Sequence, residues 1–267
     1  MKVALTVIGR LENRYAIEYV EYYKQLGVDH IYIIDNNCDG EEYFEDVLQS
    51  YIDENFITIL NYRNKEYIQI PAYKNVYDEY GKLYDYMMFF DFDEFLTLKN
   101  HKTVKEYLSD NKENFDVICI NWRLYNDNDL IYYENKPCIE RFTQPVDINN
   151  DLNNIIKSIV KTNIDKLNWY YPHVPYSHYE IFTLNYCDNN FNKIEFENIL
   201  SMRHNYNDTL AYIKHFIYKT IDEFGYKMVK GGSHTNNEEI NDFRINNFFN
   251  INKRTLEKEM ILNNYIK

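Results

Sequence analysis

Three acidic residues stand at the end of the most apolar run of the chain. The run is MMFF at 87–90, and Asp91, Asp93 and Glu94 follow it. Such a run is typical of a buried strand, and if the strand covers 86–92, Asp91 and Asp93 share one of its faces. Two neighbouring carboxylates repel each other unless a cation lies between them, and hard oxygen ligands suit Mg²⁺ or Mn²⁺. The spacing therefore predicts a divalent-metal site.

An alternative interpretation gives the same acids no chemistry. They would be exposed turn residues, with Asp93 or Glu94 capping a helix from residue 95 onward. An isolated Asp-x-Asp favours that alternative. The apolar run before the acids and the strand ends described next favour the metal site.

The first half of the chain predicts the elements that would position these acids. Strands are expected at 3–8, 30–35, 56–60, 86–92 and 117–121, and helices at 15–27, 41–52 and 71–81. This alternation predicts parallel strands joined by helical crossovers. Ligands bind beyond the carboxyl ends of such strands, so the loops 9–12, 35–39 and 91–94 are expected to meet at one rim.

The second half is less regular. Residues 122–200 mix short strands with loops rich in Asn and Asp, and residues 237–266 have the pattern of an amphipathic helical tail. A helix is predicted over 208–224, with an apolar stripe through Leu210, Ile213, Ile217, Ile221 and Phe224. On its opposite face His215 and Lys219 are four residues apart. An ordinary solvated face is the alternative for that pair.

These elements predict an α/β fold with a mostly parallel central sheet flanked by helices, an irregular second half and C-terminal helices. We expect a single domain, 1–267, divided into a first half (1–125), a less regular second half (126–235) and a helical tail (236–267).

Composition limits the function classes. The chain has 267 residues, 45% of them hydrophobic, and a net charge of −13, which disfavours nucleic acids and broad attachment to anionic lipid. The cysteines are far apart and predict reduced thiols in the cytoplasm: Cys38, Cys119, Cys138 and Cys187. The apolar N-terminal run is too short for a membrane span. We expect a cytoplasmic protein that contacts the membrane, if at all, peripherally at its inner face.

Several segments, in order, resemble one enzyme family. The segment FFDFDEFL resembles the Asp-x-Asp motif of GT-A glycosyltransferases, and more narrowly that of glycosyltransferase family 92 and its bacterial relatives in family 2. The opening RLENRYAIEYVEYYKQLGVDHIYIIDNN is similar to the family's first motif, with Glu12 on its glutamate but Leu11 and Arg10 in place of asparagine and lysine. Further similar segments are IQIPAYKNVY with Gln69, INWRLY, IIKSIVKTNID and IKHFIYKTIDEFGYKMVKGG. After INWRLY, Asn126 stands where the family has glycine. The resemblance covers about residues 3–232.

The resemblance implies a sugar-nucleotide donor whose diphosphate is bridged to the Asp-x-Asp carboxylates by Mn²⁺ or Mg²⁺. Asp93 is then the expected direct ligand, Asp91 a ligand or a ribose contact, and His215 a third ligand. The expected donor contacts are Glu12, Asp35, Asp91, Trp122, Lys157, His173, Lys219 and Lys230, with Lys227 beside them. An Asx turn is the alternative role for Asp35, a helix cap for Glu12 and a core position for Trp122.

An inverting transfer, which the resemblance favours, needs a carboxylate base for the acceptor hydroxyl. Glu180 is our candidate, with Asp127 and Asp147 as rivals. We expect an enzyme that transfers a sugar, with galactose from UDP-galactose as our hypothesis, to a glycan or glycolipid of the bacterial surface. The alternatives are a metal-dependent nucleotidyltransferase or phosphohydrolase, and a non-catalytic glycan-binding protein of the same fold.

Overall fold

The predicted α/β class with a mostly parallel central sheet is confirmed. The computed structural model describes residues 1–177, 183–197, 202–230 and 238–266. Strands within them are β1 (Val3–Gly9), β2 (His30–Asp35), β3 (Ile57–Asn61), β4 (Tyr86–Phe89), β5 (Glu94–Leu98), β6 (Val117–Leu124), β7 (Ile156–Lys161), β8 (Leu167–Trp169), β9 (Pro175–Ser177), β10 (Tyr186–Cys187), β11 (Lys193–Ile194) and β12 (Ala211–His215). The α-helices are α1 (Asn13–Gln25), α2 (Glu45–Asp53), α3 (Gln69–Tyr80), α4 (Val104–Leu108), α5 (Cys138–Arg141), α6 (Ile221–Lys230), α7 (Glu238–Ile251) and α8 (Leu256–Ile266).

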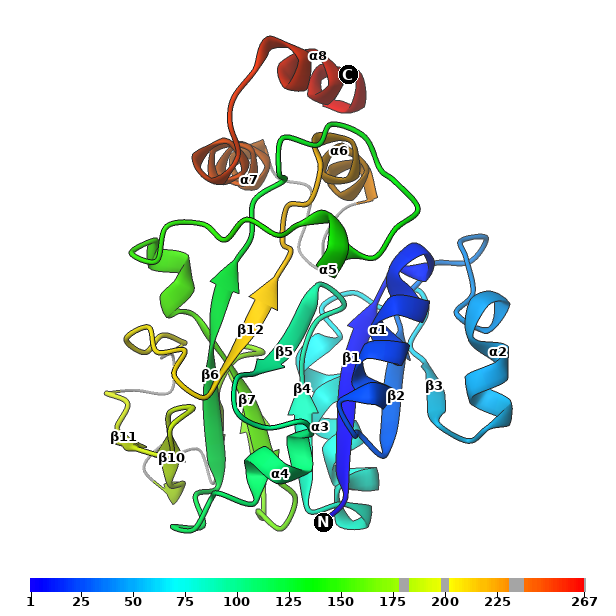
Figure 1. Ribbon diagram of the computed structural model, residues 1–267. Coiled ribbons are helices and arrows are strands. Elements are labelled where there is room, and N and C mark those ends of the chain that lie inside the picture. The colour runs from blue at the N-terminus through cyan, green and yellow to red at the C-terminus, as the bar shows by residue number, and fades with distance from the viewer. Residues whose placement is uncertain (178–182, 198–201, 231–237, 267) are drawn as a thin grey trace.

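Ten of these strands form one sheet (Figure 1). Its main order is β11-β10-β6-β7-β4-β1-β2-β3, and β12 pairs with β6 and β5. Strands β4, β1, β2 and β3 are parallel, as is β6 with β10 and β12, whereas β7 is antiparallel to both β4 and β6. The start of β7 therefore lies beside the carboxyl ends of β4 and β6, which brings Lys157 to the rim where the parallel strands end.

Apolar side chains are buried on both faces of the sheet. Along β1, Val3, Leu5 and Val7 pack toward one cluster and Ala4 toward the other, as the two-residue period of a strand requires. Helices α1, α2 and α4 contribute to the first cluster and α3 to the second. Tyrosine forms much of this core, so many of the 28 tyrosines have a packing role.

The chain leaves α1 through a Schellman turn. The amides of Gly27 and Val28 donate to the carbonyls of Lys24 and Tyr23, and Gly27 has a φ of +89°. Only glycine takes this left-handed conformation without steric cost, so the predicted stop at Gly27 is confirmed.

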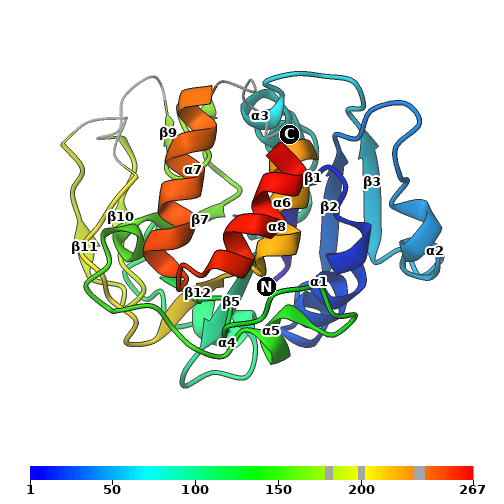
Figure 2. The same ribbon diagram turned by 90° about the horizontal axis from the view of Figure 1, so that it is seen from above.

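The C-terminal helices lie over the carboxyl ends of the strands. Figures 1 and 2 show α6, α7 and α8 together beyond the sheet, and their apolar residues form a third cluster that includes Phe224, Phe248 and Leu262. The predicted helical tail is confirmed as two helices. None of the helices in the described part of the chain is long and apolar enough to cross a membrane.

Candidate active site

The acidic residues form a tight turn rather than the end of a strand. Strand β4 stops at Phe89 and β5 starts at Glu94, so the predicted strand over 86–92 is too long and the predicted alternation of Asp91 and Asp93 on one strand face is wrong. The Glu94 amide donates to the Asp91 carbonyl (3.0 Å), and the Asp91 amide donates to Glu94 Oε2 (2.9 Å). These bonds close the acidic turn, residues 91–94. A strand follows it, not the helix of the alternative interpretation.

A buried aromatic ring anchors the acidic turn between its two aspartates. Phe92 stacks on Phe44 with ring centroids 5.4 Å apart, and it also contacts Tyr19. A Cβ atom on Gly9 would lie 2.5 Å from the Phe92 ring. The end of β1 can therefore carry only glycine at this point, and the close approach fixes where Asp91 and Asp93 emerge.

Lys157 neutralises the first part of the turn from below. Its side chain is fully buried, with Nζ 2.7 Å from Asp91 Oδ2 and 3.5 Å from Glu94 Oε2. Burial alone would lower the pKa of Lys157, but Asp91 and then Glu94 raise it. Burial raises the pKa of Glu94 well above its usual value, against the pull of Lys157. Asp91, whose side chain is 34% exposed, also accepts a hydrogen bond from Gln69 Nε2 (3.2 Å).

Asp93 has different partners. Its Oδ1 lies 3.4 Å from His215 Nε2, and its Oδ2 lies 3.1 Å from Nζ of Lys227, a side chain that is 45% exposed. Burial would raise the pKa of Asp93, yet Lys227 and then His215 hold it well below its usual value. Burial lowers the pKa of His215, so its imidazole is neutral near pH 7.

The residues around His215 correct a prediction. The helix expected over 208–224 is wrong, because His215 ends strand β12 and α6 begins only at Ile221. Lys219 lies in the connection between them with a φ of +49°. The two residues are thus not on one helix face, although both come close to Asp93, whose charge raises the pKa of the buried Lys219 against the lowering effect of burial.

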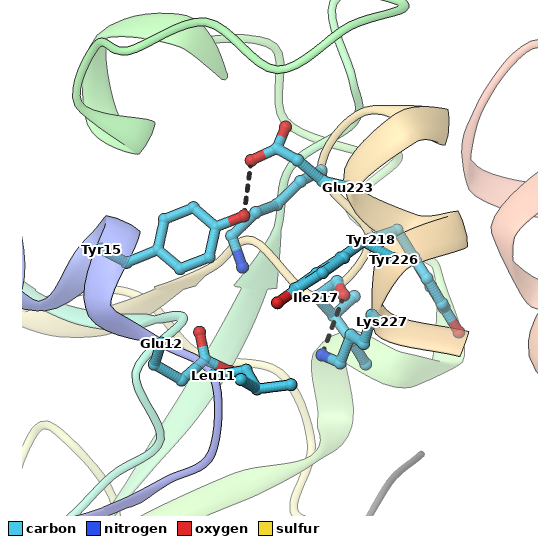
Figure 3. Close-up of a pocket in the computed structure, with 9 residues that line it drawn as sticks. Leu11, Glu12, Tyr15, Ile217, Tyr218, Glu223, Tyr226 and Lys227 are labelled. Carbon is cyan, nitrogen blue, oxygen red and sulfur yellow. Dashed lines mark hydrogen bonds between the residues drawn. The ribbon is translucent and has the colours of Figure 1, made fainter. Parts of the chain in front are cut away.

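A pocket opens beside these cations. Its lining comes from the start of α1 and from residues around the start of α6 (Figure 3): Leu11, Glu12, Tyr15, Ile217, Tyr218, Lys219, Glu223, Tyr226 and Lys227. Glu12 precedes the first residue of α1 but makes no side-chain cap there, so its side chain is at the pocket instead of serving as the helix cap of the alternative.

The donor atoms at Asp93 fit a divalent cation. A carboxylate oxygen faces a neutral imidazole nitrogen at 3.4 Å, which is longer than a good hydrogen bond. Carboxylate oxygen binds Mn²⁺ and Mg²⁺, and imidazole nitrogen binds transition-metal ions, so the pair suits Mn²⁺ better than Mg²⁺. His215 Nδ1 is buried without a hydrogen-bond partner among the described residues. Asp93 and His215 are only two ligands, and the described chain holds no cluster of three or more metal-ligating side chains. Further ligands could be Asp91, water or oxygens of the bound molecule.

Trp122 and His173 lie next to His215. The Trp122 ring is 4.1 Å from the His215 ring and 5.5 Å from that of His173, measured between centroids. Trp122 is buried, as the core alternative predicted, and its indole N–H has no partner in the described parts of the chain. Burial, with Lys157, lowers the pKa of His173 to about 4, and its Nδ1 contacts the Ile156 carbonyl. Contact of either ring with a sugar stays a prediction.

Asp35 forms the Asx turn that was the alternative to a ribose contact. Its Oδ1 accepts hydrogen bonds from the amide and the side chain of Asn37, and its Oδ2 accepts one from Arg63 (2.7 Å). A ribose hydroxyl would have to share these oxygens. Arg63 was missed, since nothing in the sequence marks it as the partner of Asp35.

The three candidate bases, Glu180, Asp127 and Asp147, lie in different surroundings or outside the described residues. Glu180 lies outside the described residues, and Lys230, an expected donor contact, is the last residue of α6. Asp127 is buried and paired with Lys258 of α8 at 2.5 Å. Asp147 is exposed and accepts a hydrogen bond from the Asn149 amide.

The sequence interpretation also missed the carboxylate in the pocket wall. Glu223 is buried and receives hydrogen bonds from Arg141 of α5 and Tyr15 of α1. It also pairs with Thr220 as a capping box at the start of α6. The Thr-x-x-Glu spacing of that box was the available signal.

The sequence profile of glycosyltransferase family 92 matches residues 12–255. No curated protein matches the chain. All four cysteines are free thiols in the structure.

Solved glycosyltransferases are similar at low identity. S. aureus TarS is 12% identical with a TM-score of 0.43, over 94% of this chain and 43% of that chain. S. aureus TarS 1-349 in complex with UDP-GlcNAc is 13% identical with a TM-score of 0.42, over 99% and 79%. GalNAc-T7 with UDP, GalNAc and Mn²⁺ is 14% identical with a TM-score of 0.28, over 47% and 24%. The chain spans less than half the length of the first TarS structures, 43% to 47%. A shared fold does not fix a substrate.

Proposed function

The chain belongs to glycosyltransferase family 92 and is a glycosyltransferase, and from that premise we propose that it uses a UDP-sugar donor and a divalent cation. One observation carries this proposal. Asp93, His215, Lys219 and Lys227 converge beside a pocket at the carboxyl ends of parallel strands, where ligands of such sheets bind. Carboxylate and imidazole suit a metal, and the two ammonium groups suit phosphates.

Asp93 and His215 would hold the cation, with Asp91 as the nearest further carboxylate. When bound, Mn²⁺ or Mg²⁺ supplies positive charge against the leaving nucleoside diphosphate. Lys219 and Lys227 would bind diphosphate oxygens as point charges. With a net charge of −13, the protein needs such local cations to attract a dianionic ligand.

The remaining donor contacts keep the roles expected from the family. Glu12 lines the pocket, which supports the proposal that it accepts a hydrogen bond from a hydroxyl of the sugar-nucleotide donor. Lys157 is buried beneath Asp91, so its contribution would be to orient that carboxylate. Trp122, His173 and Lys230 are proposed to complete the donor site, whereas Asp35, held by Asn37 and Arg63, would support the loop beside it.

Acceptor activation is assigned to Glu180. A carboxylate base would take the proton of the acceptor hydroxyl while the hydroxyl oxygen attacks the anomeric carbon of the sugar. The bond between UDP and the sugar would break, and the anomeric configuration would invert. Asp127 is the weaker rival, because its ion pair with Lys258 occupies it.

The biological reaction is proposed from the family. The donor is UDP-galactose, and the acceptor is a glycan or glycolipid in surface polysaccharide or lipooligosaccharide synthesis. We place the reaction in the cytoplasm, at the inner face of the membrane. The chain would act as one domain, with 1–125 for the donor, 126–235 for the acceptor and diphosphate, and 236–267 as its helical tail.

A UDP-release assay tests the proposal. The full chain would be incubated with UDP-galactose, UDP-glucose and UDP-N-acetylglucosamine, each with Mn²⁺, with Mg²⁺ and with EDTA. We expect metal-dependent release of UDP from at least one donor, fastest with UDP-galactose. Release of pyrophosphate or inorganic phosphate as first product would contradict sugar transfer. Equal rates of UDP release with and without EDTA would contradict the proposed metal dependence.

A further inference from the structure

Glu223 lies four residues from each pocket lysine, at the centre of a buried polar cluster. Its Oε1 accepts hydrogen bonds from the Tyr15 hydroxyl (2.7 Å) and Arg141 Nη2 (2.9 Å). Its Oε2 accepts from Arg141 Nη1 (2.7 Å) and the Thr220 hydroxyl (2.8 Å). We call Tyr15, Arg141, Thr220 and Glu223 the Glu223 cluster. It joins α1, α5 and α6, and two of its members, Tyr15 and Glu223, line the pocket (Figure 3).

The Glu223 cluster holds Lys219 in two ways. The Tyr15 ring, fixed through its hydroxyl, faces the Lys219 ammonium at 4.3 Å from the ring centroid. The Thr220 hydroxyl caps α6 through the Glu223 amide (3.2 Å), directly after Lys219. Lys219 has a φ of +49°, a conformation that a non-glycine residue keeps only where its surroundings hold it.

Lys227 depends on the same cluster through the helix. It lies one turn after Glu223, on the same face of α6, and its ammonium contacts Asp93 (3.1 Å) and the Ile217 carbonyl (3.3 Å). Since the cap fixes where α6 starts, it also fixes which face of the helix presents Lys227 to the acidic turn.

The charge of Glu223 does not oppose an anion at the pocket. Arg141 forms a two-pronged ion pair with it, and both side chains are almost fully buried. Burial would raise the pKa of Glu223, but Arg141 lowers it, so the pair is ionised and locally neutral. The cluster can thus orient two lysines without repelling phosphate.

We propose that Glu223 is a positioning residue for donor binding, which fixes Lys219 and Lys227 for the diphosphate of a nucleoside diphosphate sugar. This inference rests on the proposed function, because it takes the diphosphate as the ligand of the two lysines. It assigns Glu223 no contact with the reacting atoms.

UDP titration calorimetry of the full chain with Mn²⁺ tests the role. The variants are Glu223→Gln and the milder Tyr15→Phe, which removes one hydroxyl and keeps the ring under Lys219. We expect UDP affinity to fall by about tenfold in Glu223→Gln and by about threefold in Tyr15→Phe. A purely electrostatic role predicts the opposite for Glu223→Gln, because an uncompensated Arg141 would attract UDP more strongly.

Two matched controls separate positioning from stability. Tyr265→Phe also removes a tyrosine hydroxyl that donates to a carboxylate of α6, Asp222 at 2.6 Å, and Lys258→Met breaks another buried ion pair, with Asp127. None of these residues lines the pocket. Both controls should lower the melting temperature and leave UDP affinity within about twofold of the wild type. Affinity that is unchanged or higher in Glu223→Gln and Tyr15→Phe, or that falls equally in the controls, overturns the inference.

A nucleotide-free measurement keeps the inference distinguishable from the proposed function. Lys219 is buried, so its amine should react slowly with an acylating reagent followed by peptide mass spectrometry. We expect labelling several-fold faster in Glu223→Gln and Tyr15→Phe than in the wild type and both controls. Equal rates overturn the positioning role. If the wild type binds no UDP, the proposed donor is wrong, and the labelling rates still decide whether Glu223 positions Lys219.

Discussion

Two carboxylate groups at the rim of the sheet differ in how firmly their partners hold them. At the end of β2, Asp35 pairs with Arg63, and both side chains are almost completely buried, at 4% and 8% exposure. The Arg63 guanidinium also donates to the carbonyls of Cys38 and Glu42. This pair is closed, because no partner can leave without exposing a buried charge to apolar surroundings.

At the end of β4, Asp93 has partners that can exchange. Lys227 is half-exposed, and the contact with His215 is longer than a good hydrogen bond. Asp91 is partly exposed as well. A cation could therefore replace Lys227 as the partner of Asp93, and a phosphate could replace Asp93 as the partner of Lys227. Neither exchange would leave a buried charge unpaired.

The difference teaches that charge at a strand end is not enough to indicate a binding site. A carboxylate committed to buried partners stabilises the loop that carries it, whereas one with replaceable partners is available to a ligand. On this criterion we expect a ligand to bind at the acidic turn, and we expect the Asp35–Arg63 pair to stabilise the neighbouring loop.

The largest effect should come from a substitution at Asp93, whose partners can exchange. Asp93→Asn removes the carboxylate charge at almost constant shape, so we expect the rate of sugar transfer to fall by about 100-fold or more, with little change in melting temperature. Steady-state kinetics and thermal unfolding would measure both. Asp53→Asn, an exposed aspartate at the end of α2, is the control. Transfer at the wild-type rate in Asp93→Asn would remove the distinction between the two groups.

A substitution in the buried Asp35–Arg63 pair should lower the stability of the fold. Arg63→Met leaves Asp35 buried without its counter-charge, and we expect the free energy of unfolding to fall by about 3–5 kcal/mol in urea. Arg10→Met is the matched control, because the Arg10–Glu41 pair on the same rim is partly exposed and should lose no more than about 1 kcal/mol. Similar losses in the two variants would show that burial does not determine how much an ion pair contributes to stability.

Gly9 connects the two groups, since it ends β1 between β2 and β4. Gly9→Ala would push Phe92 away and displace the acidic turn, with a loss of about 1–3 kcal/mol in stability and a fall in transfer rate. In Gly81→Ala the new Cβ meets nothing closer than 3.7 Å, so stability and rate should hardly change. A stable Gly9→Ala variant with full activity would mean that the ring does not fix the turn.

Acid titration should give the smallest effect. Arg141 lowers the pKa of Glu223 in the folded state against the effect of burial, so this group stabilises the fold above its unfolded pKa of about 4.3, and that stability is lost as pH falls through the folded pKa. From about pH 5 downward, unfolding free energy should fall more steeply in the wild type than in Glu223→Gln. Parallel curves would contradict the assignment.

The sequence was most informative where its pattern is local. Strand β1, helix α1 and strand β2 each follow from a continuous apolar or periodic run with a glycine or polar stop, and the predicted and observed bounds differ by only a few residues. The acids of the turn were found because they interrupt such a run. Their exact geometry was not, since Phe92 turns inward through contacts with Gly9 and Phe44 that lie far away in the sequence.

The predicted helix over 208–224 is wrong because strand β12 and the start of helix α6 together place apolar residues at the spacing of a single helix. Ala211, Ile213 and His215 are buried at alternate positions of a strand, and the apolar residues from Ile221 belong to α6. The capping box at Thr220 was the local signal against a continuous helix. Ion-pair partners such as Arg63, Arg141 and Lys258 have no local signal, because tertiary packing selects them.

A crystal structure of the full chain with UDP and Mn²⁺ tests the central claim most directly. We predict the metal on Asp93 and His215 and the diphosphate within hydrogen-bond distance of Lys219 and Lys227, with the Asp35–Arg63 pair unchanged. A nucleotide bound elsewhere, with Asp93 still paired only to Lys227 and His215, would contradict the account.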